Sequence, residues 1–189
     1  MRHRTLPAVL AMTFVLSTAA LAADLDGVHL SNTLVVDHTT LRLNGIGLRT
    51  KYFFKIYVGG LYLARPNSNA AEIIAAHTPK ALVMRFVRNV SHSQMAEAYR
   101  EAFVRNAPAL MARQKAAVDR FLAFLPDMKN GERLVFTYDP GSGSTFDAGQ
   151  SRTLTIPGKA FADLYLQVFI GPHPPTVRLK DELLGTEGS

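Results

Sequence analysis

A run of aromatic and aliphatic residues at positions 51–63 limits the fold of this 189-residue chain more than any other segment. Aromatic and β-branched residues at this density are typical of β-strands. Gly59 and Gly60 fall inside the run and indicate a bulge or the close approach of another backbone. The segment predicts one long and mostly buried strand.

Shorter runs of β-forming residues predict further strands on both sides of this segment, at residues 28–30, 33–36, 41–43, 81–90, 134–138, 145–148 and 152–156. Residues 44–47 indicate a turn or a bulge. Apolar residues at helical spacing predict helices at 70–76, after Ser91, around 118–125, from Pro157 to Gly171 and at 176–184. This order is not strict β-α-β alternation. It predicts an α+β domain, in which helices pack on one side of an antiparallel sheet.

The clearest helix start is at Ser91. A serine followed three residues later by Gln94 is the pattern of a capping box, in which each side chain bonds to the other residue's backbone N–H. The apolar residues that follow recur at i, i+3, i+4, i+7 and i+8, and they predict one apolar helix face: Met95, Ala98, Tyr99, Ala102 and Phe103.

The N-terminus has the pattern of a secretory signal. Basic residues at positions 2–4 precede an apolar stretch that ends in Ala20-Leu21-Ala22, a good site for signal peptidase. A membrane anchor is the alternative reading, but the stretch is about 17 residues, at the lower limit for a helix that spans a bilayer. We therefore expect a signal peptide at 1–22, a single domain at 23–189, and export to the periplasm or the exterior.

Composition narrows the classes of partner. The chain has 21 basic and 15 acidic side chains, and its formal net charge is +6. The bases are spread along the sequence without a dense cluster, which argues against nucleic acid as a partner. The excess basic charge is first of all consistent with plain solubility, and an anionic ligand or peripheral contact with an anionic membrane surface is the alternative. The chain has no cysteine, so its stability comes from packing and hydrogen bonding.

Few residues suggest catalysis. The sequence has no cysteine nucleophile and no G-x-S-x-G elbow. The histidines outside the predicted signal are not spaced as metal ligands: His29, His38, His77, His92 and His173. We therefore expect neither a metal nor another cofactor.

Basic and aromatic side chains gather in residues 44–58. Arg49 and Tyr57 are eight residues apart, and in an unbroken strand an even separation places two side chains on the same face. On the wall of a pocket, a guanidinium and a phenol could together bind a carboxylate whose apolar tail fills the pocket. The alternative is that Arg49 lies on a solvated edge while Tyr57 is part of the core.

The same segment resembles a known family. Its pattern is Gly45-x-Gly47-x-Arg49 followed by Lys55-x-Tyr57-x-x-Gly60-x-Tyr62-Leu63. Further matching pieces occur in the same order along the chain at residues 85–91, 138–145, 156–161 and 179–185. Together they are similar to the chalcone isomerase-like family, and most of all to its bacterial members. The resemblance implies an open-faced β-sandwich, with a large antiparallel sheet, a layer of helices and a cleft between them.

The resemblance also implies roles for individual residues. The family includes isomerases that close a chalcone to a flavanone and non-catalytic members that bind fatty acids. Arg49 matches an arginine that binds the substrate or ligand, and Tyr57 matches a tyrosine of the fatty-acid binders. Met95 and Ala102 stand where the isomerases have a polar pair. The resemblance therefore implies a ligand pair of Arg49 and Tyr57, with Met95, Tyr99 and Ala102 lining the tail cavity. Simple helix-to-sheet packing is the alternative for these last three.

Three functions remain as hypotheses. The first is non-catalytic binding of a fatty acid or similar apolar carboxylate in the cell envelope. The second is a chalcone isomerase-type lyase or isomerase, in which Arg49 acts as the electrophile with help from Tyr57 or Tyr52. The third is an envelope protein-interaction module without a small ligand. The apolar residues at positions 95 and 102 favour the first hypothesis, and we expect no catalytic residue.

Overall fold

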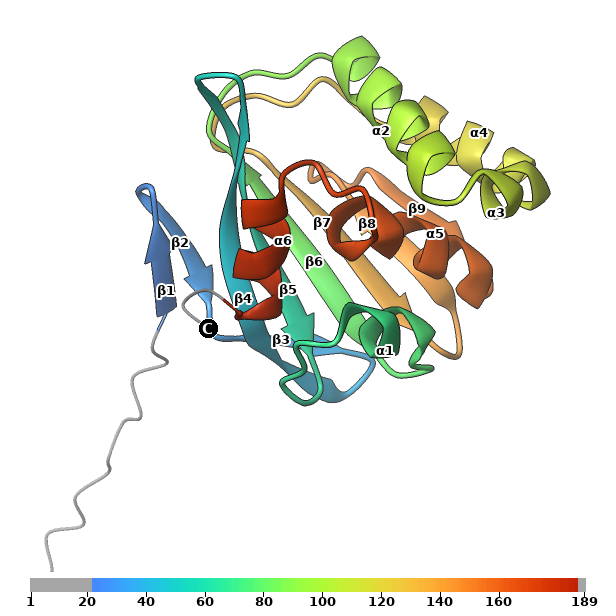
Figure 1. Ribbon diagram of the computed structural model, residues 1–189, viewed down its shortest axis with the longest axis horizontal. Helices are drawn as coiled ribbons and strands as arrows, with labels where there is room; N and C mark the ends of the chain where they lie inside the picture. Colours follow the sequence, from blue (N-terminus) through green and yellow to red (C-terminus); the bar gives the residue numbers. More distant parts are fainter. Residues whose placement is uncertain (1–21, 187–189) are drawn as a thin grey trace, which may run out of the picture.

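Seven strands form one antiparallel sheet in which every strand pairs with its neighbour in the chain. A computed structural model describes residues 22–186. The strands of the sheet are β3 (Thr33–Val36), β4 (Thr39–Lys51), β5 (Phe54–Leu63), β6 (Lys80–Phe86), β7 (Arg133–Asp139), β8 (Gly143–Asp147) and β9 (Thr153–Ile156). A separate two-stranded hairpin consists of β1 (Ala22–Leu25) and β2 (Val28–Ser31), and it lies beside β4 (Figure 1).

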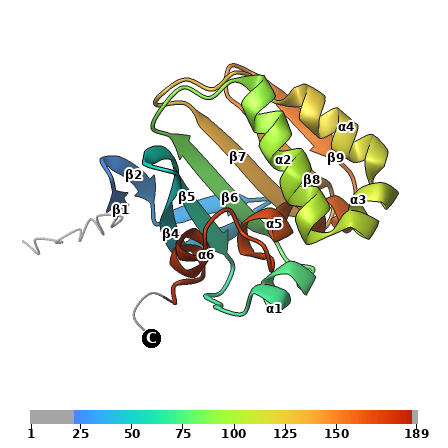
Figure 2. The ribbon, with the colours of Figure 1, turned by 45° about the horizontal axis from the view of Figure 1, so that its top comes forward.

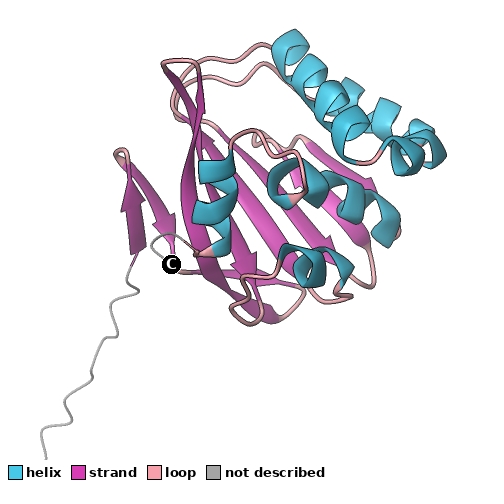
Figure 3. Ribbon diagram, in the orientation of Figure 1, coloured by secondary structure: helices cyan, strands magenta, loops and turns pink. Residues whose placement is uncertain are grey.

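The helices form a layer over one face of this sheet (Figure 3). They are α1 (Ala70–Ala75), α2 (His92–Asn106), α3 (Pro108–Arg113), α4 (Lys115–Phe124), α5 (Lys159–Ile170) and α6 (Val177–Leu184). Between the helices and the sheet lies the larger hydrophobic core, while β2 and β3 help to cover a smaller core on the opposite face. The predicted α+β open-faced sandwich is therefore confirmed.

Strand β5 is apolar in consecutive positions because both of its faces are buried. Tyr57 and Leu61 pack into the helix-side core, whereas Val58 and Tyr62 pack into the core on the other face. Successive side chains of a strand point to opposite faces, and both faces of β5 are covered. The expected burial is confirmed for residues 57–63, whereas residues 51–55 are exposed.

The expectation of one unbroken strand at 51–63 is wrong. Strand β4 ends at Lys51 and β5 begins at Phe54, so the chain reverses at Tyr52 and Phe53. Tyr52 adopts a positive φ of 55°, a conformation that glycine or asparagine usually supplies at such turns. Because neither glycine nor asparagine occurs at this turn, the sequence pattern at 51–63 predicts a continuous strand. The predicted strand at 81–90 also ends early, at Phe86, and the sequence analysis missed β1 and α3.

Residues 44–47 form a bulge within β4, one of the two predicted alternatives. The pairing of β4 with β5 shifts register between Leu43 and Gly45, and the strand then continues. The two glycines of this segment lie against the backbone and side chains of α6. A Cβ atom at Gly45 would lie 2.1 Å from the carbonyl oxygen of Glu182, and one at Gly47 would lie 2.7 Å from the Glu182 side chain.

Glu182 anchors α6 to the bulged strand. Its carboxylate is buried and accepts a hydrogen bond of 2.7 Å from the backbone N–H of Leu48 and another of 2.7 Å from Nε of Arg178. The backbone carbonyl of Leu183 accepts a 2.9 Å bond from the Asn44 side chain. These bonds require that α6 approach β4 closely, which only glycine at positions 45 and 47 permits.

Helix α2 begins as the sequence predicts. The Ser91 hydroxyl accepts a hydrogen bond from the backbone N–H of Gln94, and the Gln94 side chain accepts one from the backbone N–H of Ser91. The capping box is therefore confirmed. Of the predicted apolar face, Ala98 alone is exposed, and the others are buried: Met95, Tyr99, Ala102 and Phe103.

Within residues 22–186, no helix has the length and apolar composition that a bilayer span requires. The segment predicted as a signal peptide lies, apart from Ala22, outside the described residues. The expected cleavage and export remain predictions.

Candidate functional site

A cavity of about 460 Å³ opens between the helix-side face of the sheet and helix α2. The β4–β5 hairpin and the end of β6 form one wall, and α2 with the end of α5 forms the other. Its volume falls within the range of small-molecule pockets. Every residue predicted for the site lines this cavity: Arg49, Tyr57, Met95, Tyr99 and Ala102.

Arg49 and Tyr57 are brought together by the hairpin. Their Cα atoms are direct partners in the β4–β5 ladder, so the two side chains lie on the same face of the sheet. The expected proximity therefore arises from cross-strand pairing and not from an even spacing along one strand. The ligand-binding role of the pair stays a prediction.

Tyr57 is a buried residue whose hydroxyl has no protein partner. The residue is 9% exposed, and none of the described residues forms a hydrogen bond with its hydroxyl. The ring is held edge-on against Phe86, with 5.8 Å between the ring centroids. Burial raises the pKa of Tyr57, and the positive charge of Arg49 opposes that shift. At neutral pH the hydroxyl is thus protonated and can donate a hydrogen bond to a ligand.

Arg49 is a part-buried cation beside it. Its guanidinium donates to the backbone carbonyl of Thr50, and no carboxylate of the described residues pairs with it. Burial lowers the pKa of Arg49, Tyr57 opposes this shift, and the nearby charge of Arg105 adds to it. An arginine stays charged in proteins, so the site holds a positive charge that an anion could neutralise.

The surroundings of Arg49 are positively charged. Lys51, Arg88 and Arg105 also line the cavity, and none of them forms an ion pair with a described carboxylate. Among the described lining residues, Glu101 is the only carboxylate. This imbalance favours an anionic ligand.

The remainder of the wall is apolar. It includes Met84, Phe86, Met95, Val168 and Phe169, all of which are buried. Ala98 and Ala102 leave room along α2, because they are small side chains on successive turns. A polar mouth followed by an apolar wall suits a ligand with a charged head and an apolar tail.

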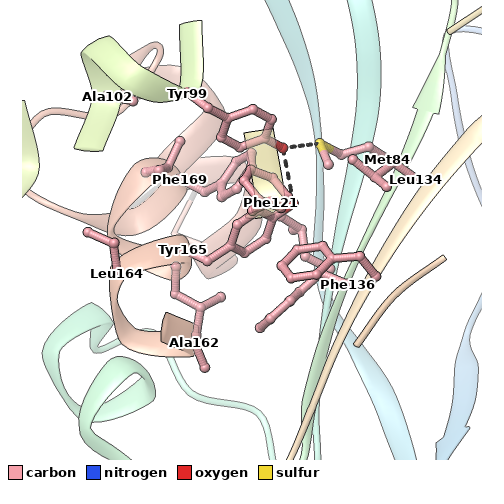
Figure 4. Packing of buried hydrophobic residues seen from close by; sticks show 14 of the residues in the cluster. Met84, Tyr99, Ala102, Phe121, Leu134, Phe136, Ala162, Leu164, Tyr165 and Phe169 are labelled. Atoms are coloured by element: carbon pink, nitrogen blue, oxygen red, sulfur yellow. Dashed lines mark hydrogen bonds between the residues drawn. The ribbon is translucent and has the colours of Figure 1, made fainter. Parts of the chain in front are cut away.

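Tyr99 contributes its ring to this wall, while its hydroxyl turns into the core (Figure 4). That hydroxyl lies 3.1 Å from the Tyr165 hydroxyl and 3.8 Å from the sulfur of Met84. Burial is the main cause that raises the pKa of Tyr99, and the neighbouring Tyr165 raises it further. Tyr99 is therefore a packing residue with a satisfied hydroxyl, and it belongs to both the cavity wall and the core.

Sequence reasoning missed two arginines of the site. Arg105 lies seven residues after Ala98 and three after Ala102, and this helical spacing places all three toward the cavity. Arg88 lies after the end of β6, and its guanidinium carbon is 4.4 Å from the centroid of the Phe54 ring. No local pattern pairs Arg88 with Phe54, because the contact joins two separate segments. Among residues 22–186, no three histidine or acidic side chains gather as metal ligands would.

The fold and the site together define a class: an open-faced β-sandwich with a cationic, apolar-walled cavity under its helices. The model of the chalcone isomerase-like family matches residues 22–185, so the chain belongs to the chalcone isomerase-like family. The resemblance of the sequence motifs to this family is thus confirmed. No curated protein matches the sequence.

Solved structures match the fold, with 38 similar chains. One is the crystal structure of a fatty-acid binding protein of Arabidopsis thaliana, which superposes with a TM-score of 0.59 at 13% sequence identity. The match covers 80% of this chain and 95% of that one. At this identity the likeness shows a shared fold.

Proposed function

We propose that this protein binds a fatty acid or a similar apolar carboxylate without transforming it, and that it does so in the cell envelope. The observation that carries the proposal is the cross-strand pair of Arg49 and Tyr57 at one wall of an apolar cavity. The pair offers a cationic donor and a neutral donor, and neither has a carboxylate partner among the described residues.

A carboxylate fits these two donors. Hydrogen bonds between an arginine and a carboxylate are charge-assisted and stronger than neutral ones. The Tyr57 hydroxyl would gain the partner that it lacks, which stabilises the bound state. The tail would then lie against the apolar wall, where each buried CH₂ group contributes about 0.8 kcal/mol.

The same geometry argues against an isomerase. Met95 and Ala102 present apolar side chains to the cavity and cannot hold a water molecule or move a proton. Tyr57 and Tyr99 both have raised pKa values, so neither is a base at neutral pH. The named function of the Arabidopsis relative, fatty-acid binding, is in keeping with a non-catalytic role. Location in the envelope is supported by the signal-like N-terminus.

Native mass spectrometry of the mature protein, purified from an exporting host, tests the proposal. We expect a fatty-acid adduct on the wild type and its loss in Arg49→Ala, with affinity reduced by about tenfold to a hundredfold. Arg42→Ala is the matched control, because Arg42 is an exposed arginine of the same strand and does not line the cavity.

Two results would contradict the proposal. The first is a bare mass in all three proteins after incubation with fatty acids, which would favour an interaction module. The second is turnover of a chalcone that Arg49→Ala abolishes and Arg42→Ala does not, which would favour the isomerase. Cleavage after residue 22 or 23 is read from the same spectra, and an uncleaved N-terminus would remove the support for export.

A further inference from the structure

The turn between β4 and β5 exposes three consecutive aromatic residues. Tyr52 is 84% exposed, Phe53 98% and Phe54 57%. Single apolar residues are common on protein surfaces, but a contiguous aromatic group usually marks a site of interaction. Phe53 is at the apex and does not line the cavity, so nothing within the described chain accounts for its position.

Basic side chains surround this aromatic turn. Lys51 and Lys55 flank it directly, and Arg88 lies over the ring of Phe54 at 4.4 Å. Lys55 forms an ion pair with Asp26, whereas Lys51 and Arg88 have no carboxylate partner among the described residues. Aromatic side chains with lysine and arginine beside them are typical of segments that lie in the interface of an anionic bilayer.

The aromatic turn is continuous with the mouth of the cavity. Lys51, Tyr52 and Phe54 belong both to the turn and to the cavity lining. In Figures 1 and 2 the turn lies at one end of the sheet, beside the loops that connect β6 with α2 and α4 with β7. A surface that receives this turn would therefore also lie against the cavity mouth.

We propose that residues 51–55 dock the protein on an anionic lipid bilayer. Phe53 and its aromatic neighbours enter the headgroup region, and Lys51 and Arg88 contact anionic headgroups. Docking in this orientation holds the cavity mouth at the membrane surface, where a fatty acid could pass between bilayer and cavity. The passage of ligand rests on the proposed function, whereas the docking itself does not.

A tryptophan reporter gives the most direct test, because the chain has no tryptophan of its own. In Phe53→Trp, we expect the fluorescence emission to shift to shorter wavelength with phosphatidylglycerol vesicles. We expect a weaker shift with phosphatidylcholine vesicles and reversal by high salt, because salt screens the headgroup contacts. Val35→Trp is the matched control: Val35 is 67% exposed on β3, and its emission should not change.

Co-sedimentation with the same vesicles measures the energetics. Phe53→Ser removes an exposed side chain, so the fold should be unaffected, and we expect vesicle binding about tenfold weaker. Lys51→Glu reverses the flanking charge and should weaken binding to phosphatidylglycerol by a similar factor, about tenfold. Val35→Ser should bind as the wild type does.

The two proposals fail separately. An unshifted emission in Phe53→Trp, or undiminished sedimentation of Phe53→Ser, would overturn the membrane proposal. The Phe53 variants should keep the fatty-acid adduct, because Phe53 does not line the cavity, so an adduct without vesicle binding overturns only the docking. Vesicle binding by a protein that takes up no fatty acid would overturn only the proposed function.

Discussion

The hydroxyl of Tyr99 lies 3.1 Å from the hydroxyl of Tyr165, within a cluster of stacked and edge-on aromatic rings. Tyr57 lines the same cavity as Tyr99, yet its hydroxyl has no partner among the described residues. Two buried tyrosines of one cavity therefore differ in the state of their hydroxyls. This difference separates a residue that supports the fold from one that is available to a ligand.

Tyr57→Phe should weaken ligand binding without weakening the fold. The unpaired hydroxyl is removed, so the free energy of unfolding should stay constant or rise by about 1 kcal/mol, while fatty-acid affinity falls by roughly fivefold to tenfold. Tyr99→Phe is the comparison: it leaves Tyr165 without its partner and should lower the unfolding free energy by about 1 to 2 kcal/mol. Urea unfolding and a fatty-acid titration measure both quantities. A destabilised Tyr57→Phe would show that its hydroxyl is needed by the fold.

Ala98→Phe should select shorter ligands. Ala98 is exposed toward the cavity and is not part of the packed core, so a phenyl ring can occupy cavity volume without repacking α2. We expect the longest fatty acids to lose affinity by about tenfold or more, with short ones little affected. Val104→Phe is the control on the same helix, at an exposed position that does not line the cavity. If affinity depends on fatty-acid chain length in the same way in both variants, the tail does not lie beside Ala98.

Gly45→Ala should destabilise the protein through helix α6. The new methyl group would lie 2.1 Å from the carbonyl oxygen of Glu182 and 2.5 Å from that of Leu183, and backbone atoms cannot give way there. We expect a loss of about 3 kcal/mol in the free energy of unfolding by urea. In Gly141→Ala the nearest atom is the end of the Asp139 side chain at 3.2 Å, so this control should be nearly neutral.

Lys80 gives the protein a specific pH dependence. The side chain is buried, and its ammonium donates hydrogen bonds of 2.6 Å to the carbonyls of Ile73 and Ala76. Burial and, to a smaller extent, the charge of Lys159 lower the pKa of Lys80, while Asp163 opposes the shift, and the pKa is about 8. The ordinary pKa is 10.5, so between these two values the unfolded chain binds more protons than the folded one. Stability therefore rises with pH in this window.

Unfolding by urea should show this rise. The free energy of unfolding should increase by about 1 to 2 kcal/mol between about pH 7 and about pH 9.5, below the range where the tyrosines ionise. Lys80→Met should abolish the increase, whereas Lys129→Met, at an exposed lysine, should preserve it. An equal slope in Lys80→Met would assign the pH dependence to other groups.

The sequence alone predicted those features whose signals are local. The capping box at Ser91 and Gln94 follows from residues three apart, and the apolar face with Met95 and Tyr99 follows from helical period. The order of elements predicted the α+β class, and the spaced motifs around Arg49 predicted the family. In each case the pattern lies within one element or repeats along the chain.

Contacts between distant segments were decided by the tertiary structure. The turn at Tyr52 carries no turn signal; its positive φ fits a tight reversal between two long paired strands. Only glycine fits at position 45, because α6, more than 130 residues later in the chain, lies against it. The cavity joins Arg88 and Arg105 from different elements. Propensity and periodicity depend on residues that are close in the sequence. A site depends on which distant segments the packed core brings together.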